Sequence, residues 1–234
     1  MKNDAKSTFY HIDFSFDQLR LGGSAFAQSQ GYVGSDVPTV KNPDYFREAF
    51  NAVQQLVKKG WIMAGHDISA GGLITTLLEM TFANTEGGID VNLDKFKTDD
   101  LVRVLFAENP GVVVQVADKH KKDFKALLDD AGVGYVKIGK PAEERQIMVT
   151  LGDATYQFGI DYLRDVWYET SYLLDTKQSM NGCAKQRYEN YKQQPLEYHI
   201  HPEFTGKFSQ FGLNPDRREP SGIKAAIIRE KGTN

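Results

Sequence analysis

Apolar positions recur at two different spacings along residues 10–177, and the changes between them predict alternating strands and helices. A spacing near 3.6 residues predicts helices over 43–59, 73–84, 98–106, 118–131 and 161–177. Alternation, or a short apolar run, predicts strands over 10–14, 61–64, 89–93, 111–116, 135–138, 147–151 and 155–158. This order predicts an α/β (α+β) fold in which a mixed sheet is packed with helices.

Local signals sharpen three of these elements. Asn42 is a good N-cap, Pro43 suits the first helical position, and Gly60 can end the helix between them. The pair Gly152-Asp153 predicts a hairpin turn between the last two strands. The helix over 161–177 is expected to bury one apolar face, made of Leu163, Val166, Trp167, Thr170 and Leu174.

The periodic pattern ends after Lys177. Prolines punctuate the following stretch, which predicts an extended connector over 178–222. Scattered aromatic residues argue against a free linker, because such side chains usually dock on a surface: Tyr188, Tyr191, Tyr198, Phe204, Phe208 and Phe211. Residues 224–229 then predict a new strand. We therefore expect three parts, over 1–177, 178–222 and 223–234.

Composition excludes several classes of protein. Hydrophobic residues make up 41% of the chain and charged residues 25%, as in a soluble globular protein. The net charge of −3 provides no basic field for nucleic acid or an anionic membrane. The single cysteine, Cys183, excludes an internal disulfide and a four-cysteine zinc site. No apolar run approaches the ~20 residues of a membrane span, and we expect a cytoplasmic protein without nucleic-acid or membrane partners.

The segment His66–Gly72 is the strongest candidate for chemistry. A predicted buried strand ends at a carboxylate, Asp67, and glycines open a helix just beyond it. Helix N-termini attract phosphate, and Mg²⁺ prefers carboxylate and phosphate oxygens. Asp67 is thus a candidate metal ligand, and Ser69, Gly71 and Gly72 are candidate nucleotide contacts. The alternative is that Asp67 or Ser69 caps the helix while the glycines permit tight packing; the residues alone favour this.

Other candidates are weaker. The turn Gly22-Gly23-Ser24 could hold phosphate, but it lacks the lysine of a Walker A loop and the dinucleotide glycine spacing, so a strand–helix turn is the simpler interpretation. Glu79 faces either a ligand cleft or the edge of the buried helix face. Glu108 is interpreted as part of a turn. His199 and His201 alternate without further metal ligands at suitable spacing.

Five segments, in order, resemble the phosphoribosylformylglycinamidine synthase family. Residues 21–28 resemble its "LGGSALAQ" element, and 66–73 with 79–83 resemble "HDxSDGGL…LLEMAFA". The remaining three are 105–116, similar to "LFNEExGVVxQV"; 163–171, similar to "LRxxWxETS"; and 224–234, similar to "KVAIxREKGxN". Ala70 stands where the second signature has aspartate, so one carboxylate of that loop is missing.

This resemblance implies a lobe of a ligase. The family converts formylglycinamide ribonucleotide, glutamine and ATP to formylglycinamidine ribonucleotide, glutamate, ADP and phosphate. The chain would be the second lobe like the C-terminal domain of aminoimidazole ribonucleotide synthetase in the long single-chain form. The connector and the start of the glutaminase domain would follow it. The remaining synthetase lobes and the glutaminase would be its partners.

The resemblance also implies roles for single residues. Asp67 would bind Mg²⁺, and Ser69, with Gly71 and Gly72, would contact ATP or ADP in an auxiliary site. No catalytic residue is expected in this chain. Two alternatives stay open: a stand-alone nucleotide-binding module of the same fold, and another enzyme of the superfamily, such as a selenophosphate synthetase or thiamine-phosphate kinase. The latter would not need residues 178–234.

Overall fold

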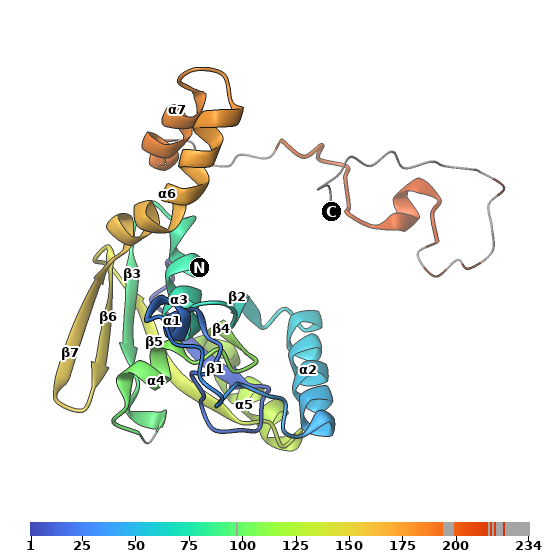
Figure 1. The fold of residues 1–234 in the computed structure, drawn as a ribbon. Helices are drawn as coiled ribbons and strands as arrows, with labels where there is room; N and C mark the ends of the chain where they lie inside the picture. Colours follow the sequence, from blue (N-terminus) through green and yellow to red (C-terminus); the bar gives the residue numbers. More distant parts are fainter. Residues whose placement is uncertain (97, 194–198, 215, 217, 219–221, 223–234) are drawn as a thin grey trace. The chain divides into compact units, whose positions relative to one another are not determined.

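The structure, a computed structural model, describes residues 1–96, 98–193 and 199–214, together with residues 216, 218 and 222. It forms two compact units, Met1–Gln193 and Gln194–Asn234. Figure 1 shows the course of the chain. The strand predicted over 224–229, and with it the third predicted part, lies outside the described residues.

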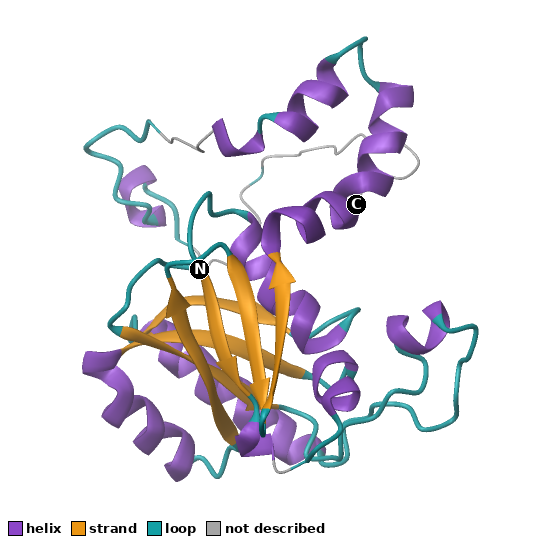
Figure 2. Ribbon diagram, turned by 90° about the vertical axis from the view of Figure 1, so that its left-hand side faces the viewer, coloured by secondary structure: helices purple, strands orange, loops and turns teal. Residues whose placement is uncertain are grey.

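A seven-stranded mixed sheet forms the centre of the first unit. Its strands run in the order β2-β4-β1-β5-β3-β6-β7, and every neighbouring pair is antiparallel except β3 and β6. Figure 2 shows the sheet with helices around it. Their bounds are Ser7–Asp13 (β1), Ile62–Asp67 (β2), Gly88–Asn92 (β3), Gly111–Ala117 (β4), Tyr135–Ala142 (β5), Gln146–Leu151 (β6) and Ala154–Gly159 (β7).

Seven helices are described in all. They are Ala25–Ser29 (α1), Pro43–Lys58 (α2), Gly72–Phe82 (α3), Leu101–Phe106 (α4), Lys121–Asp130 (α5), Ile160–Gln178 (α6) and Cys183–Glu189 (α7). Helices α3 and α4 pack on one face of this sheet and α2 and α5 on the other. Single 3₁₀ turns cover Asp94–Phe96, Asp118–His120, Tyr191–Gln193 and Phe208–Phe211. The predicted mixed sheet with packed helices is confirmed.

Side chains alternate across β1, so the strand contributes to two separate cores. Tyr10 and Ile12 pack with α2 and α5 through residues such as Leu56 and Phe124. Phe9, on the opposite face, packs with α3 and α4 through residues such as Leu77 and Leu105. Both cores are closed by helices, which leaves the strand ends and connecting loops as the places where polar chemistry can gather.

The local signals for α2 act as predicted. The Asn42 side chain accepts hydrogen bonds from the N–H groups of Asp44 (3.0 Å) and Tyr45 (3.1 Å), and Pro43 is the first helical residue. Gly60 adopts φ +67° just after the helix, which ends it as expected for a glycine in the left-handed region. Gly152 takes φ +58° in the β6–β7 hairpin. These short-range predictions are therefore confirmed.

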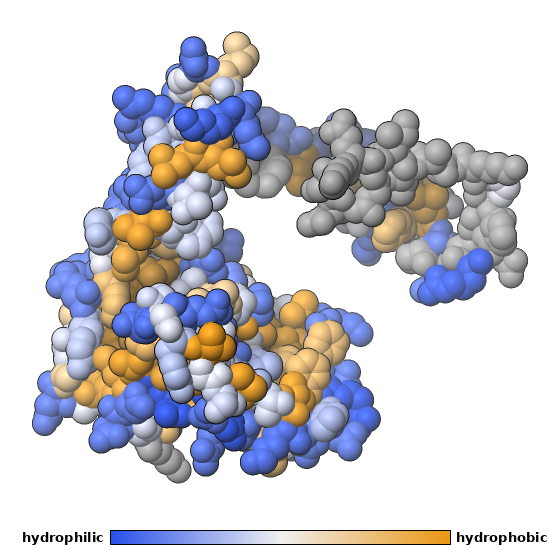
Figure 3. Space-filling view, in the orientation of Figure 1, coloured by the Kyte–Doolittle hydropathy of each residue, from blue (hydrophilic) through white to orange (hydrophobic). Residues whose placement is uncertain are grey.

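The prediction that α6 buries one apolar face is wrong from Val166 onward. Ile160 is fully buried at the start of the helix, but Val166, Trp167 and Leu174 are 51%, 52% and 59% exposed. Only the first turns of α6 lie against the sheet and α3, and the rest of the helix runs beyond them (Figure 1). Apolar side chains are accordingly visible on the surface over α6 (Figure 3).

The first unit continues past Lys177, because α7 folds back onto α6. Arg164 of α6 is 7% exposed and lies over the rings of Tyr168, Tyr188 and Tyr191, with its guanidinium carbon 3.8 Å from the Tyr191 centroid. The Nη1 atom of Arg164 also donates to the Tyr188 carbonyl (3.0 Å). Two aromatics of the predicted connector thus dock on the lobe. In the second unit, the rings of Phe204 and Phe211 contact each other.

Candidate functional site

The junction between β2 and α3 carries the predicted metal ligand. We call residues Asp67–Gly72 the open junction. Asp67 is the last residue of β2, and its main-chain carbonyl accepts a hydrogen bond from the buried Thr76 hydroxyl (3.1 Å). Its side chain is 74% exposed, and Ser69 and Ala70 are exposed beside it. The fold therefore anchors the backbone of Asp67 and leaves its carboxylate in solvent.

The two glycines of the open junction have structural reasons to be glycine. Gly71 and Gly72 adopt φ +86° and +70°. A Cβ on Gly72 would lie 2.7 Å from the Leu105 carbonyl oxygen, and no side chain caps α3. Tight packing, the alternative considered for these glycines, accounts for both residues. Their predicted nucleotide contact stays a prediction.

A line of polar contacts runs from Asp67 to α6. His66 Nδ1 lies 3.5 Å from Asp67 Oδ1, and His66 Nε2 lies 3.3 Å from Glu79 Oε2. Trp167 Nε1 donates to Glu79 Oε1 (2.9 Å). Glu79, whose role the sequence left open, is 23% exposed and faces His66. The exposed Trp167 of α6 thus reaches the open junction through Glu79 and His66.

The metal-binding capacity of this junction is limited to one carboxylate. The described ranges contain no group of three or more His, Cys, Asp or Glu side chains that could hold a metal ion. Mg²⁺ usually takes one or two protein carboxylates and fills its remaining positions with phosphate oxygens and water. Asp67 fits that pattern as a single ligand, provided that a nucleotide supplies the other oxygens.

The second phosphate-loop candidate is closed by the chain itself. We call residues Leu21–Ala25 the closed turn. The N–H of Gly22 donates to the Asp36 carbonyl (2.8 Å), that of Gly23 to the Val33 carbonyl, and that of Ser24 to the Leu21 carbonyl (3.2 Å). A Cβ on Gly22 would lie 2.6 Å from the backbone of Asp36. These donors are already used, so the strand–helix turn is the correct interpretation.

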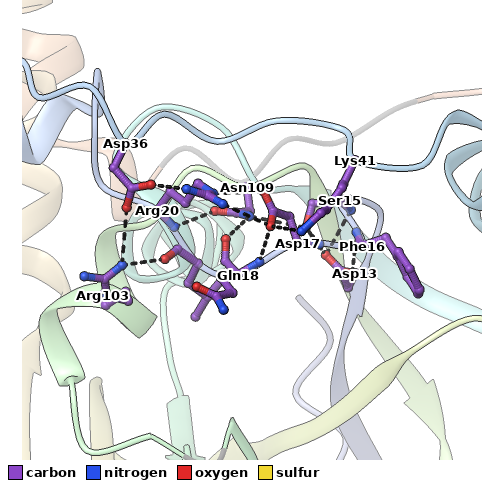
Figure 4. Close-up of polar contacts among 11 residues, drawn as sticks. Asp13, Ser15, Phe16, Asp17, Gln18, Arg20, Asp36, Lys41, Arg103 and Asn109 are labelled. Carbon is purple, nitrogen blue, oxygen red and sulfur yellow. Dashed lines mark hydrogen bonds and ion pairs between the residues drawn. The ribbon is translucent and has the colours of Figure 1, made fainter.

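A polar network holds the closed turn in place (Figure 4). The Asp17 side chain is 1% exposed and accepts from Arg20 Nε (2.9 Å), while Lys41 Nζ lies 3.5 Å away. The hydrogen bond from Arg20 lowers the pKa of the Asp17 carboxyl to about 2. The Arg20 guanidinium also pairs with Asp36, and the main-chain N–H of Arg20 donates to the Asn109 side-chain oxygen (3.0 Å). The loops on either side of the turn are therefore fixed by charge.

A pocket of about 290 Å³ lies next to the closed turn. Asp67 and Ser69 do not line it, so this pocket is separate from the exposed carboxylate. Its lining includes Leu21, Gly22, Phe26, Tyr32, Asp36 and Arg103.

Glu108 joins the closed turn to the open junction. Its Oε1 accepts from the N–H of Ala25 (2.8 Å) and from the N–H of Gly71 (2.8 Å). The sequence interpretation of Glu108 as part of a turn missed this contact. The two partners lie 83 and 37 residues away along the chain, so no local pattern could have shown it.

Comparison with protein families decides the classification. Residues 15–152 match the model of the "AIR synthase related protein, C-terminal domain" family, which covers more than half of the chain. The chain belongs to this family. The matched range of this AIR synthase related domain contains the open junction, the closed turn and Glu108. Within the described residues, no helix is long and apolar enough to cross a membrane.

Three curated relatives of this AIR synthase related domain carry the same enzyme name. The chain is 34% identical over 231 residues to a phosphoribosylformylglycinamidine synthase of Schizosaccharomyces pombe, and 31% identical over 238 residues to that of Homo sapiens. It is 32% identical over 227 residues to a probable chloroplastic/mitochondrial one of Arabidopsis thaliana. The matches cover 95%, 99% and 96% of this chain but only 16–17% of the relatives' length.

Solved structures share the fold. Thermotoga maritima PurL complexed with ATP superposes with a TM-score of 0.55 at 13% identity, over 70% of this chain and 26% of that one. PurL complexed with FGAR gives a TM-score of 0.55 at 14% identity, over 69% and 28%. At such low identity the likeness establishes the fold, and the prediction of a lobe like the aminoimidazole ribonucleotide synthetase C-terminal domain is confirmed.

Proposed function

We propose that this chain is one lobe of a phosphoribosylformylglycinamidine synthase, a ligase of purine biosynthesis that uses ATP and glutamine. The support is the shared name of its curated relatives and their similarity over nearly the whole chain. The chain spans 16–17% of those proteins, so the activity belongs to a larger assembly. Residues 178–222 would connect this lobe to a glutaminase domain that begins at 223–234.

The lobe contributes an Mg-nucleotide contact at the open junction. The observation that carries this proposal is the exposure of the Asp67 carboxylate and of Ser69 at the point where β2 meets the 11-residue helix α3. Solved proteins with the same fold are described as complexes with ATP and ADP. An anchored, solvent-facing carboxylate next to the positive end of a helix suits a metal–phosphate pair.

Each residue has a definite task in this proposal. Asp67 supplies one oxygen ligand to Mg²⁺, which neutralises phosphate charge when bound. The Ser69 hydroxyl donates to a phosphate oxygen, and the positive end of the α3 dipole favours the phosphate charge. In this proposal the site is auxiliary, as the family resemblance implies. Bound ATP or ADP would stabilise the folded lobe by linkage.

The remaining parts of the active enzyme come from outside this lobe. The other synthetase lobes and a glutaminase that supplies ammonia are its proposed partners. The cytoplasmic location stays a prediction, since one curated relative carries a chloroplastic/mitochondrial name.

A segment exchange tests the proposal. The matching segment of the Schizosaccharomyces pombe enzyme is replaced by this chain, and ADP formation that depends on both formylglycinamide ribonucleotide and glutamine is measured. We expect turnover by the chimera and none by the 234-residue chain alone. The control is the same enzyme with the segment deleted.

Two results would contradict the proposal. One is a chimera that folds, as judged by circular dichroism and gel filtration, yet shows no turnover above the deletion control. The other is glutamine hydrolysis or ligase turnover by the isolated chain, because this account places those reactions in other parts of the protein.

A further inference from the structure

One carboxylate oxygen connects two loops that lie far apart in the sequence. Glu108 Oε1 accepts hydrogen bonds from Ala25 N–H and Gly71 N–H, both 2.8 Å long. Ala25 is the last residue of the closed turn and the first residue of α1, and Gly71 directly precedes α3. Hydrogen bonds to an ionised acceptor are stronger than neutral ones. The shared oxygen therefore fixes the distance between the two loops.

Packing around Glu108 reinforces the same connection. The ring of Phe26 stacks on that of Phe106, with centroids 4.7 Å apart and planes 25° from parallel. Gly72 lies so close to the backbone of Leu105 and Phe106 that a Cβ would come within 2.7 Å of it. Residues 105–108 thus contact the closed turn on one side and the open junction on the other.

The closed turn can serve as a rigid base for this connection. Its own N–H groups are satisfied by residues 21, 33 and 36, and the buried Asp17 network holds the neighbouring loops. The open junction has less internal support, because Asp67, Ser69 and Ala70 are exposed and no side chain caps α3. The start of the junction is held at Asp67 and Ile68 by the Thr76 hydroxyl and the Gly111 carbonyl, so its end depends on the attachment at Gly71 and Gly72.

We propose that Glu108 is a positioning residue for the nucleotide site: it holds the Ser69–Gly72 backbone against the closed turn. This inference rests on the proposed function of the open junction. It also changes the role predicted for Gly71. The Gly71 N–H is taken by Glu108 and the Gly72 N–H by the Ser69 carbonyl (3.0 Å), so both glycines contribute their left-handed conformation, and the phosphate contact comes from Ser69.

Amide exchange of the 234-residue chain, measured without any ligand, tests whether Glu108 holds the Gly71 backbone against the closed turn. Glu108→Ala should speed exchange of the Ala25 and Gly71 N–H groups about tenfold or more, the effect of losing a hydrogen bond to a charged acceptor. Exchange in β4, for example at Val114, should stay unchanged. Glu108→Gln keeps an acceptor oxygen and should show a smaller increase. Glu86→Ala, an exposed glutamate in another loop, is the matched control.

Mg-ADP titration of the same variants tests the positioning role. We expect Glu108→Ala to raise the Kd for Mg-ADP about tenfold, Glu108→Gln to restore part of the affinity, and Glu86→Ala to match the wild type. Unchanged exchange at Gly71 in both Glu108 variants would show that Glu108 does not hold the Gly71 backbone, and would overturn the proposal. Faster exchange with unchanged Mg-ADP affinity would overturn the positioning role. No Mg-ADP binding by the wild-type chain would overturn the proposed function itself, and the positioning role with it.

Discussion

The closed turn and the open junction look alike in sequence and differ in structure. Each has a pair of glycines before a helix, and each is a candidate phosphate loop. In the closed turn the N–H groups of Gly22 and Gly23 donate to the backbone of residues 36 and 33. In the open junction the Asp67 carboxylate and Ser69 face solvent. The Gly71 and Gly72 N–H groups of the open junction are also taken, by Glu108 and by the Ser69 carbonyl. Glycine before a helix therefore signals close backbone approach in both loops, and the exposed side chains of Asp67 and Ser69 distinguish the open junction.

Replacing Gly72 should have the largest effect on stability. An alanine there needs φ +70° and places its Cβ 2.7 Å from the Leu105 carbonyl oxygen. We expect Gly72→Ala to lower the free energy of unfolding by about 3 kcal/mol, from backbone strain and overpacking together. Gly60 has a similar φ of +67° with no atom within 4 Å of an added Cβ.

Gly60→Ala is the matched control and should cost only about 1 kcal/mol. Urea unfolding of both variants gives the comparison. Equal losses would show that contact with α4 does not fix the start of α3, and the open junction would then lack its structural anchor.

Two histidines that flank Val113 in the sheet differ in burial, as the two turns do. His11 is 8% exposed, and His66 is 31% exposed at its side chain. Burial lowers the pKa of His11 from 6.5 to about 4. The folded state then resists protonation, so stability is full above pH 6.5 and is lost as the pH falls from 6.5 toward 4.

This shift predicts a loss of about 2 kcal/mol in the free energy of unfolding between pH 7 and pH 5. The Asp17 carboxyl, with its pKa near 2, stays ionised over that interval. Urea unfolding at both pH values measures the loss, and His11→Phe should remove most of it. If the free energy of unfolding falls by the same amount in His11→Phe and in wild type, the pH dependence comes from other groups.

A pair of serines compares the two turns directly. Ser24 is 1% exposed, and its Oγ accepts from the Ala27 N–H (3.1 Å) and donates to the Leu21 carbonyl (2.6 Å). Ser24→Ala should cost about 1 kcal/mol of stability, as for the loss of a helix cap. Ser69→Ala should cost less than about 0.5 kcal/mol, because its side chain is exposed. Thermal unfolding of both variants measures the difference, and a reversed order would contradict the contrast drawn here.

The smallest effect on stability is expected from the hydrogen bond between Trp167 and Glu79, next to the open junction. Trp167→Phe removes the indole N–H that donates to Glu79 while keeping an aromatic ring next to Phe82. Since Trp167 is 52% exposed, we expect a loss of about 0.5 kcal/mol. Tyr162→Phe, on the same helix and 72% exposed, should have no effect in the same urea assay. Equal stability of the two variants would remove α6 from the account of the junction.

The sequence predicts short-range features of this fold well. The cap of Asn42, the Gly152 turn and the order of strands and helices depend on residues close together in the chain, and the structure contains them. The predicted apolar face of α6 failed because periodicity marks a face without showing where the sheet beneath it ends. The long-range hydrogen bonds of Glu108 were missed for a similar reason, since each partner is fixed only by the complete fold.

The candidate site was predictable in part. Strand, carboxylate and glycine-opened helix are visible in residues 62–72, and the structure places Asp67 in solvent. The support from Glu79 and Trp167 required knowledge that α6 lies against α3. The sequence also could not distinguish the closed turn from the open junction, because residues 33–36, which satisfy the closed turn, form no recognisable motif.

The most direct measurement of the central claim is a calorimetric titration of ADP into the chain with Mg²⁺ and with EDTA. Wild type should bind ADP in a Mg²⁺-dependent manner, and Asp67→Asn should weaken that binding about tenfold or more through loss of the metal ligand. Asp153→Asn, in the β6–β7 hairpin, serves as the matched control and should bind like wild type. Equal Mg-ADP affinity in Asp67→Asn and wild type would contradict the assignment of the open junction as the nucleotide site.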